Sequence, residues 1–155
     1  MQGHPQVIQH LNALLTGELT AIDQYLAHSR MYRDWGFIKL HEKTEHEMLE
    51  EQEHAGALID RILFLEGKPN LDKRDALNIG KDVQDMLRND LALEYRVVEH
   101  LREVIAFCES VRDFVTRDIL LKLLKDTEED HAWWLEQQLR LIDNIGSANY
   151  LQARL

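Results

Sequence analysis

Cysteine is scarce in this 155-residue sequence, and long apolar segments are absent. The single cysteine, Cys108, excludes an intramolecular disulfide and fits a reducing compartment such as the cytosol. No segment approaches the roughly 20 apolar residues that a transmembrane helix requires. The first residues, MQGHPQ, lack the basic head and apolar core of a secretory signal. These absences predict a cytoplasmic protein that does not enter a membrane.

Basic residues are also few, with 18 Lys and Arg against 28 Asp and Glu, and the formal net charge is −10. Phosphate groups of nucleic acids are bound by clustered basic residues, so this composition argues against a nucleic-acid partner. An acidic surface can gather cations, but many proteins are acidic for solubility alone. The net charge is therefore weak evidence of function by itself.

Only two prolines and seven glycines interrupt the chain, and a helical spacing of apolar residues persists over long distances. Apolar residues recur three and four positions apart, and no convincing alternation typical of a β-strand is present. The pattern predicts four long helices and a short fifth one, for which Ser147 would be the N-cap. The helices are expected at about 5–34, 38–66, 83–110 and 113–145, with the fifth inside 147–155.

The connections between these helices predict how they are arranged. The segment 67–82 contains two Gly, one Pro and two Asn and reads as a long connection, whereas the first and third connections are short. Short connections imply antiparallel neighbours, and a long middle one can cross the bundle, as in ferritin-like topology. We therefore predict an all-α, single-domain fold over 1–155. It is a ferritin-like four-helix bundle with a long crossover between helices 2 and 3 and a short C-terminal fifth helix.

Two Glu-x-x-His pairs, Glu51–His54 and Glu128–His131, are the most informative motif. Of the eight histidines, only these two have a glutamate three residues earlier. Residues three apart lie on one face of a helix, so each pair directs a carboxylate and an imidazole the same way. One such match is expected by chance in a chain this rich in glutamate. Two matches on core-facing stripes are much more specific.

A lone glutamate accompanies each pair at a matched distance in the other helix of the same half. Glu18 precedes Glu51 by 33 residues, and Glu94 precedes Glu128 by 34. The apolar stripe of each helix is interrupted by these acidic residues near its middle. In the fourth helix the predicted stripe reads Leu121, Leu124, Glu128, His131, Leu135, Leu139 and Ile142. An antiparallel bundle would bring four carboxylates and two imidazoles to one level.

Such a set of buried charges needs compensation, because each buried carboxylate carries a desolvation cost of several kcal/mol. The carboxylates could take up protons as their pKa values rise. Two divalent cations would balance four negative charges more completely. Oxygen-rich ligation with one imidazole per ion suits iron or manganese, whereas structural zinc sites favour cysteine and histidine. Taken singly, Glu18 or Glu94 could equally reach water from the edge of its stripe.

Other polar residues have less specific patterns. Tyr25 lies two turns beyond Glu18 and could hydrogen-bond a ligand, although a packed core tyrosine is the more common case. His46, Glu47 and Glu50 precede the first pair and form a possible accessory metal site, or simply a solvated face. Four further histidines have no partner pattern and are predicted to lie at the surface: His10, His28, His41 and His100. Cys108 is predicted to be packed and inert.

With these residues placed, the sequence resembles the bacterioferritins from end to end. The resemblance lies in the segments VIQHLNALLTGELTAIDQY, RILFLEGKPNL, DLALEY, SVRDFVTRDILL and NYLQ, which occur in family order. It implies a ferroxidase centre in which Glu51 and Glu128 bridge two irons, Glu18 with His54 holds one, and Glu94 with His131 holds the other. It also implies that Fe(II) is oxidised by O2 or H2O2 and stored as mineral in a hollow shell of 24 subunits.

The chain departs from the family pattern in two places. The family holds haem b across a two-fold subunit interface through a methionine two residues before the first ligand histidine, where this chain has Gln52. Met48, one helical turn earlier, faces the same side and is a possible haem ligand, and Met31 is also available, but neither occupies the family position. Haem binding is therefore doubtful unless a haem-binding paralogue co-assembles. The fourth helix also has one additional residue near Asp126–Thr127, which could be absorbed at the turn or as a π-bulge.

These observations favour iron storage with a di-iron ferroxidase site, and two alternatives remain. One is another di-iron carboxylate enzyme, either a rubrerythrin-like peroxidase or an oxygenase. A rubredoxin-like partner domain would need paired cysteines, and the single Cys108 cannot provide them. The other alternative is a non-catalytic helical scaffold whose core carboxylates share protons. Aerobic addition of Fe(II) would distinguish the scaffold, because it would leave the rate of Fe(III) formation unchanged from buffer.

Overall fold

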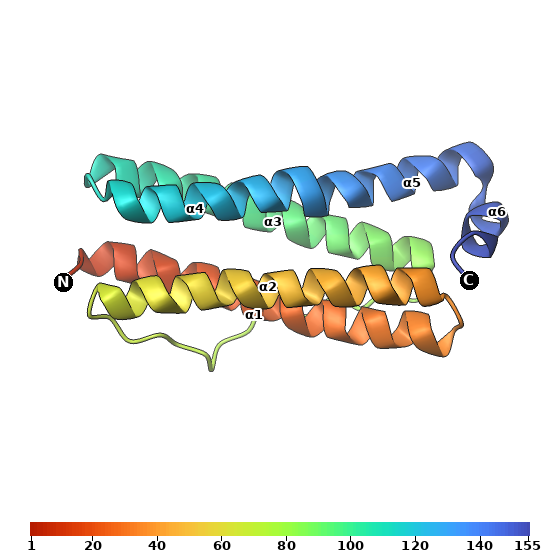
Figure 1. Cartoon of the computed structure of the whole chain (residues 1–155), viewed down its shortest axis with the longest axis horizontal. Coiled ribbons are helices and arrows are strands. Elements are labelled where there is room, and N and C mark those ends of the chain that lie inside the picture. Colours follow the sequence, from red (N-terminus) through yellow and green to blue (C-terminus); the bar gives the residue numbers. More distant parts are fainter.

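The computed structural model describes all 155 residues, and every regular element in it is helical (Figure 1). The helices α1 (Pro5–Asp34), α2 (Ile38–Phe64) and α3 (Val83–Ser110) are each continuous. The fourth rod of the bundle consists of α4 (Phe114–Asp126), a π-helical segment η1 (Thr127–Ala132) and α5 (Trp133–Ile145). The short helix α6 (Ser147–Gln152) turns away at the C-terminal end. None of these helices combines the length and apolar character needed to cross a membrane.

The topology is the predicted four-helix bundle with a long crossover. Helices α1 and α2 form one hairpin, and α3 forms a second hairpin with the rod made of α4, η1 and α5 (Figure 1). The connection between α2 and α3 returns along the length of the bundle, so that α2 and α3 run in the same direction. Two details differ from prediction. Helix α2 ends at Phe64, and Ser147 is the first residue of α6 while Gly146, with φ of 82°, is its N-cap.

The crossover has no regular secondary structure, and side chains of α1 supply the hydrogen bonds that its backbone needs. Four amide groups of the crossover, those of Asn70, Asp75, Asn78 and Gly80, donate to α1 side chains at distances of 2.8–3.1 Å. The acceptors lie four or eight residues apart along one face of α1: Asn12, Thr20, Gln24 and His28. The crossover is therefore attached to α1 along its length.

The prediction that His28 and His41 lie at the surface is wrong. His28 is fully buried; its Nδ1 lies 2.8 Å from Oδ1 of buried Asp90, and its Nε2 accepts the crossover amide of Gly80. His41 is also buried, with Nδ1 2.9 Å from the carbonyl oxygen of Ser29. His10 and His100 are half-buried. Both buried histidines are satisfied by partners that are distant in sequence or on the backbone, which no local motif encodes.

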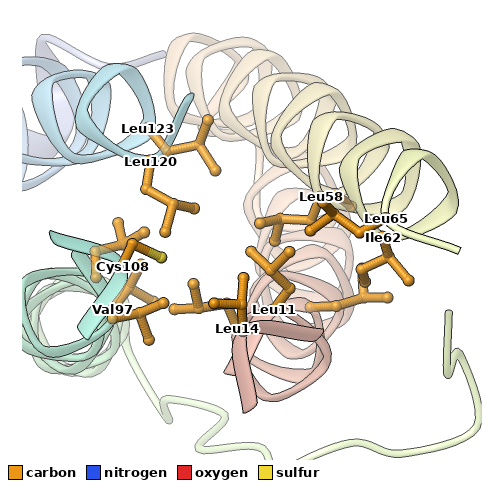
Figure 2. Packing of buried hydrophobic residues seen from close by; sticks show 14 of the residues in the cluster. Leu11, Leu14, Leu58, Ile62, Leu65, Val97, Cys108, Leu120 and Leu123 are labelled. Carbon is orange, nitrogen blue, oxygen red and sulfur yellow. The ribbon is translucent and has the colours of Figure 1, made fainter. Parts of the chain in front are cut away.

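The apolar core is divided into two main clusters near opposite ends of the bundle. One cluster contains leucines of α1 and α2 together with residues of α3 and α4, as Figure 2 shows for Leu11, Leu58, Val97 and Leu120. Cys108 is buried in this cluster, as predicted. The other cluster joins residues of all four rods with Tyr150 of α6. Between the two clusters lies a layer of buried ionisable side chains.

Candidate metal centre

The buried ionisable layer receives side chains from all four rods of the bundle. Each residue is at most 5 % exposed, and each sits where the apolar stripe of its helix is interrupted. Helices α1, α2 and α3 and the segment η1 contribute Glu18, Glu51, His54, Glu94 and His131. The structure therefore brings together five of the six residues that the sequence analysis selected.

The first group within this layer consists of Glu18, Glu51 and His54. Nδ1 of His54 lies 3.5 Å from Oε2 of Glu51 and 3.8 Å from Oε2 of Glu18. One potential ligand atom from each residue lies within 4.8 Å of the other two, all three residues being buried. This spacing allows all three residues to reach a single cation.

The second group consists of Glu51, Glu94 and His131, and it shares Glu51 with the first. Nδ1 of His131 lies 2.6 Å from Oε1 of Glu51 and 3.5 Å from Oε1 of Glu94. The other carboxylate oxygen of Glu51 faces His54. The two imidazole rings are stacked with centroids 5.7 Å apart. Glu51 thus belongs to both three-residue groups and lies between their two imidazoles.

Several polar atoms in this layer have no hydrogen-bond partner, although they are buried and close to one another. Buried polar groups in native proteins are nearly always hydrogen-bonded, because an unpaired one costs about 1–3 kcal/mol. The atoms without a well-aligned hydrogen bond are Oε2 of Glu18, Oε1 of Glu51, Nδ1 of His54, Oε2 of Glu94 and Nδ1 of His131, although Oε1 of Glu51 and Nδ1 of His131 are in close electrostatic contact at 2.6 Å. Such a cluster of unpaired donor atoms fits cation ligands better than a hydrogen-bonded network. The residues present therefore fit two metal ions.

Without cations, the layer balances its charge through protons. Burial and the charge of Glu51 raise the pKa of Glu94 to about 7, and the same causes raise the pKa of Glu18. Burial opposes protonation of His54, but its contacts with Glu18 and Glu51 outweigh this and raise its pKa to about 11. Burial also opposes ionisation of Glu51, but its contacts with Glu18 and both imidazoles lower its pKa. Metal ions must therefore displace protons to enter.

Above pH 4.5, the stability of the metal-free protein is expected to fall as pH rises. The folded-state pKa of Glu94 is about 7 against 4.5, so its contribution is complete below pH 4.5 and is lost toward pH 7. The contribution of His54 is complete below pH 6.5 and is lost as pH rises toward 11. Guanidinium unfolding at pH 6.5 and pH 9 measures the second loss. A His54→Gln variant should show a smaller fall over that interval, and a rise in wild-type stability would contradict this account.

Glu128, the sixth predicted site residue, lies outside the layer. Its carboxylate is 39 % exposed, and its Oε1 accepts a hydrogen bond of 2.8 Å from Nη2 of Arg102 on α3. The cause is the π-helix η1, which the additional residue of the fourth helix had led us to expect as one possibility. A π-helix bonds i to i+5 and takes more residues per turn, so residues three apart no longer share a face.

The same change of phase corrects the predicted stripe of the fourth helix. Counting back from His131 in α-helical steps selects Leu124 and Leu121, but Leu121 is 44 % exposed. The buried positions are one residue earlier: Thr116, Leu120, Leu123 and Thr127. The extra residue is absorbed inside η1, so everything before it is rotated relative to everything after it.

The accessory candidates lie beside His131. Nε2 of His131 is 2.7 Å from an oxygen of both Glu47 and Glu50, and Nε2 of exposed His46 is 2.7 Å from Glu50. Glu47, Glu50 and His131 form a third group whose ligand atoms lie within 4.8 Å of one another. Tyr25 is buried and its hydroxyl donates a hydrogen bond to Glu94. A residue that the sequence analysis did not select, Asp126, contacts Nε2 of His54 at 3.1 Å; nothing in its local sequence marks it.

The residues available for haem do not offer a thioether at the expected position. Gln52 is exposed on α2. Met48 is buried and packs inside the bundle with Ala21, Tyr25 and Leu93. Met31 is half-buried against the apolar cluster at the α6 end of the bundle. Neither methionine can take the place of Gln52 as a surface ligand without leaving its packing.

Comparison with known proteins identifies the fold and its relatives. Residues 8–145 match the family model described as a ferritin-like domain. The chain is 58% identical to the bacterial ferritin of Pseudomonas aeruginosa and 54% identical to that of Synechocystis, covering all of this chain and at least 99% of each relative. It is 42% identical over 150 residues to the bacterioferritin of Mycobacterium leprae, covering 97% of this chain and 94% of that protein.

Proposed function

Because this chain belongs to the ferritin-like family, we propose that it stores iron and that its buried ionisable layer oxidises Fe(II). The observation that carries this proposal is the position of Glu51 between two groups of buried, unpaired ligand atoms. Each group supplies carboxylates and one imidazole, a ligand set suited to iron or manganese. A resident structural zinc would instead favour cysteine and histidine.

Fe(II) is the substrate in this proposal, together with O2 or H2O2. Two Fe(II) ions each lose one electron, and the two electrons with two protons convert O2 to H2O2, or H2O2 to two molecules of water. Holding both ions close together lets both electrons reach one oxidant molecule. The side chains hold the ions: Glu18 and His54 on one side, Glu94 and His131 on the other, with Glu51 between them.

We also propose that Glu128 completes the site when metal is bound. It lies in the π-helix beside His131 and is held at the surface by Arg102. Joining the centre requires its side chain to leave Arg102 and rotate inward. An exposed ion pair of this type is worth only about 0–1 kcal/mol, so metal coordination can outweigh it.

The group of Glu47, Glu50 and His131 is proposed as an accessory iron site next to the centre, with His46 at its outer edge. Nε2 of His131 faces this group while Nδ1 faces Glu51 and Glu94. One imidazole thus touches both the centre and the accessory group. The arrangement would allow iron to pass between them in short steps.

The assembly proposed for this chain is a hollow 24-subunit shell, formed by this subunit alone or with a haem-binding paralogue. With Gln52 exposed and Met48 packed inside the bundle, this subunit alone is expected not to bind haem through methionine sulfur. Purified protein incubated with excess haem should therefore lack the absorption bands of methionine-ligated haem. A Gln52→Met variant, which places a thioether at that position, tests whether a methionine there restores the bands. Full methionine-type absorbance in the unmodified subunit would contradict the proposal.

Aerobic addition of Fe(II) tests the function as a whole. A ferroxidase accelerates Fe(III) absorbance above the buffer rate, and a non-catalytic scaffold with a proton-sharing core does not. Native mass then separates iron storage from the other di-iron enzymes, because a monomer of 18.2 kDa or its dimer cannot enclose a mineral. Oxidation without a shell would favour a peroxidase or oxygenase instead.

A further inference from the structure

We propose that Asp126 is a positioning residue that orients His54 as a metal ligand. The inference rests on the proposed function, because it assigns a role only if His54 binds metal through Nδ1. It concerns a residue that lies outside both three-residue groups of the centre. Its carboxylate is the only partner of His54 on the side of the ring away from Glu18 and Glu51.

The two ring nitrogens of His54 have different surroundings, and we assign them different roles. Nε2 lies 3.1 Å from Oδ2 of Asp126 in a hydrogen bond, so Nε2–H is the donor. Nδ1 has no hydrogen-bond partner and faces Glu18 and Glu51 at 3.8 and 3.5 Å. Metal binding requires a neutral imidazole, which carries one proton, and placing that proton on Nε2 leaves the Nδ1 lone pair directed into the centre.

A carboxylate suits this task better than a neutral acceptor. A metal-binding histidine commonly donates its second ring N–H to a carboxylate, which fixes the tautomer, holds the ring orientation and makes the ligand nitrogen more basic. Asp126 is the last residue of α4, immediately before η1, and it lies three residues after buried Leu123. It is therefore on the side of α4 that faces α2, within reach of His54.

Asp126 also separates His54 from solvent. An open cavity of about 380 Å³ lies between α2 and α4, lined by Asp126, His54, Glu53 and Asp118 among others. Asp126 is 33 % exposed there, whereas His54 is 6 % exposed. Water in this cavity could compete for Nε2–H if the carboxylate were removed. The His54 ring would then lose a fixed acceptor while remaining next to solvent.

Anaerobic Co(II) titration, followed through visible absorption, tests this role without any turnover. The wild-type protein should bind two Co(II) per subunit at the centre. Asp126→Ala is expected to weaken one of the two stepwise affinities by about 10- to 100-fold, as loss of such a partner usually does, and to leave the other within about twofold. Asp126→Asn keeps an acceptor oxygen and should bind better than the alanine variant.

Asp118→Ala is the matched control, because Asp118 lines the same cavity but pairs with Arg117 at 2.8 Å. This substitution removes the same charge, and the variant protein should bind both Co(II) ions as the wild type does. Equal weakening by Asp118→Ala, equal weakening of both ions by Asp126→Ala, no weakening at all, or an asparagine variant no better than alanine would each overturn the positioning role. A wild-type protein that binds no Co(II) at the centre would instead overturn the proposed function.

Discussion

Replacing Glu51 by alanine is expected to slow Fe(II) oxidation by about 1,000-fold, which corresponds to about 4 kcal/mol of lost transition-state stabilisation. The reason is its shared position: one carboxylate oxygen lies 2.6 Å from Nδ1 of His131 and the other 3.5 Å from Nδ1 of His54. No other carboxylate is shared by these two three-residue groups. Without it, each group keeps two ligands and the two ions lose their common bridge.

The matched control is Glu53→Ala, because Glu53 lies on the same helix but is exposed. Initial rates of Fe(III) absorbance growth, measured at one Fe(II) concentration for the three proteins, give the comparison. Glu53→Ala should oxidise Fe(II) at the wild-type rate. If Glu51→Ala retained more than about one tenth of that rate, oxidation would have to occur elsewhere on the protein.

Loading the metal-free protein with Zn(II) or Co(II) is expected to stabilise it by about 5 kcal/mol. A ligand that binds only the folded state at 100 times its Kd adds about 2.7 kcal/mol per site, and two sites are proposed here. The gain comes from the buried carboxylates and imidazoles, whose unpaired atoms are costly while no cation is present. Guanidinium unfolding followed by circular dichroism, with and without metal at one protein concentration, measures it.

The same unfolding measurement on Glu51→Ala and Glu53→Ala distinguishes metal bound at the centre from metal bound at the acidic surface. Cations that merely collect on the surface would stabilise both variants equally, since the net charge of each changes by the same amount. We expect Glu53→Ala to gain as much as the wild type and Glu51→Ala to gain much less. Equal gains in the two variants would show that the buried layer is not where the metal binds.

The long helices and their topology were predictable because the signals are local. The apolar period predicts the bounds of α1 and α3 as the structure has them, and Gly36 and Gly146 coincide with breaks in the bundle. The segment 67–82 is correctly predicted to be the crossover. A helical period is a property of one segment and its neighbours, so tertiary packing did not overturn it.

The errors come from features that depend on distant parts of the chain. His28 was assigned to the surface because nothing near it in sequence is a partner, yet it meets Asp90 on α3, 62 residues away, and the amide of Gly80. Its burial depends on the packing of both α3 and the crossover against α1. Asp126 and His54, which are in contact, are likewise 72 residues apart in the sequence. Local patterns cannot encode such pairs.

Glu128 was misplaced for a different reason, since its residue type and spacing matched the motif. The assumption that failed was a constant helical period through residues 127–132, where the structure has a π-helix. The sequence does contain a signal, the one additional residue in the fourth helix, but it does not say where the phase changes. Leu123 and His131, which are both buried, lie on either side of that change.

Because the apolar core is divided, each end of the bundle has its own buried apolar cluster. Each end of the bundle is held by its own cluster, whereas the middle contains the buried carboxylates and imidazoles that are proposed to bind cations. A change of several charges at the waist therefore need not loosen either end. If the proposed centre binds and releases iron, the two apolar clusters would hold the ends of the bundle in place while the charge at its middle changes.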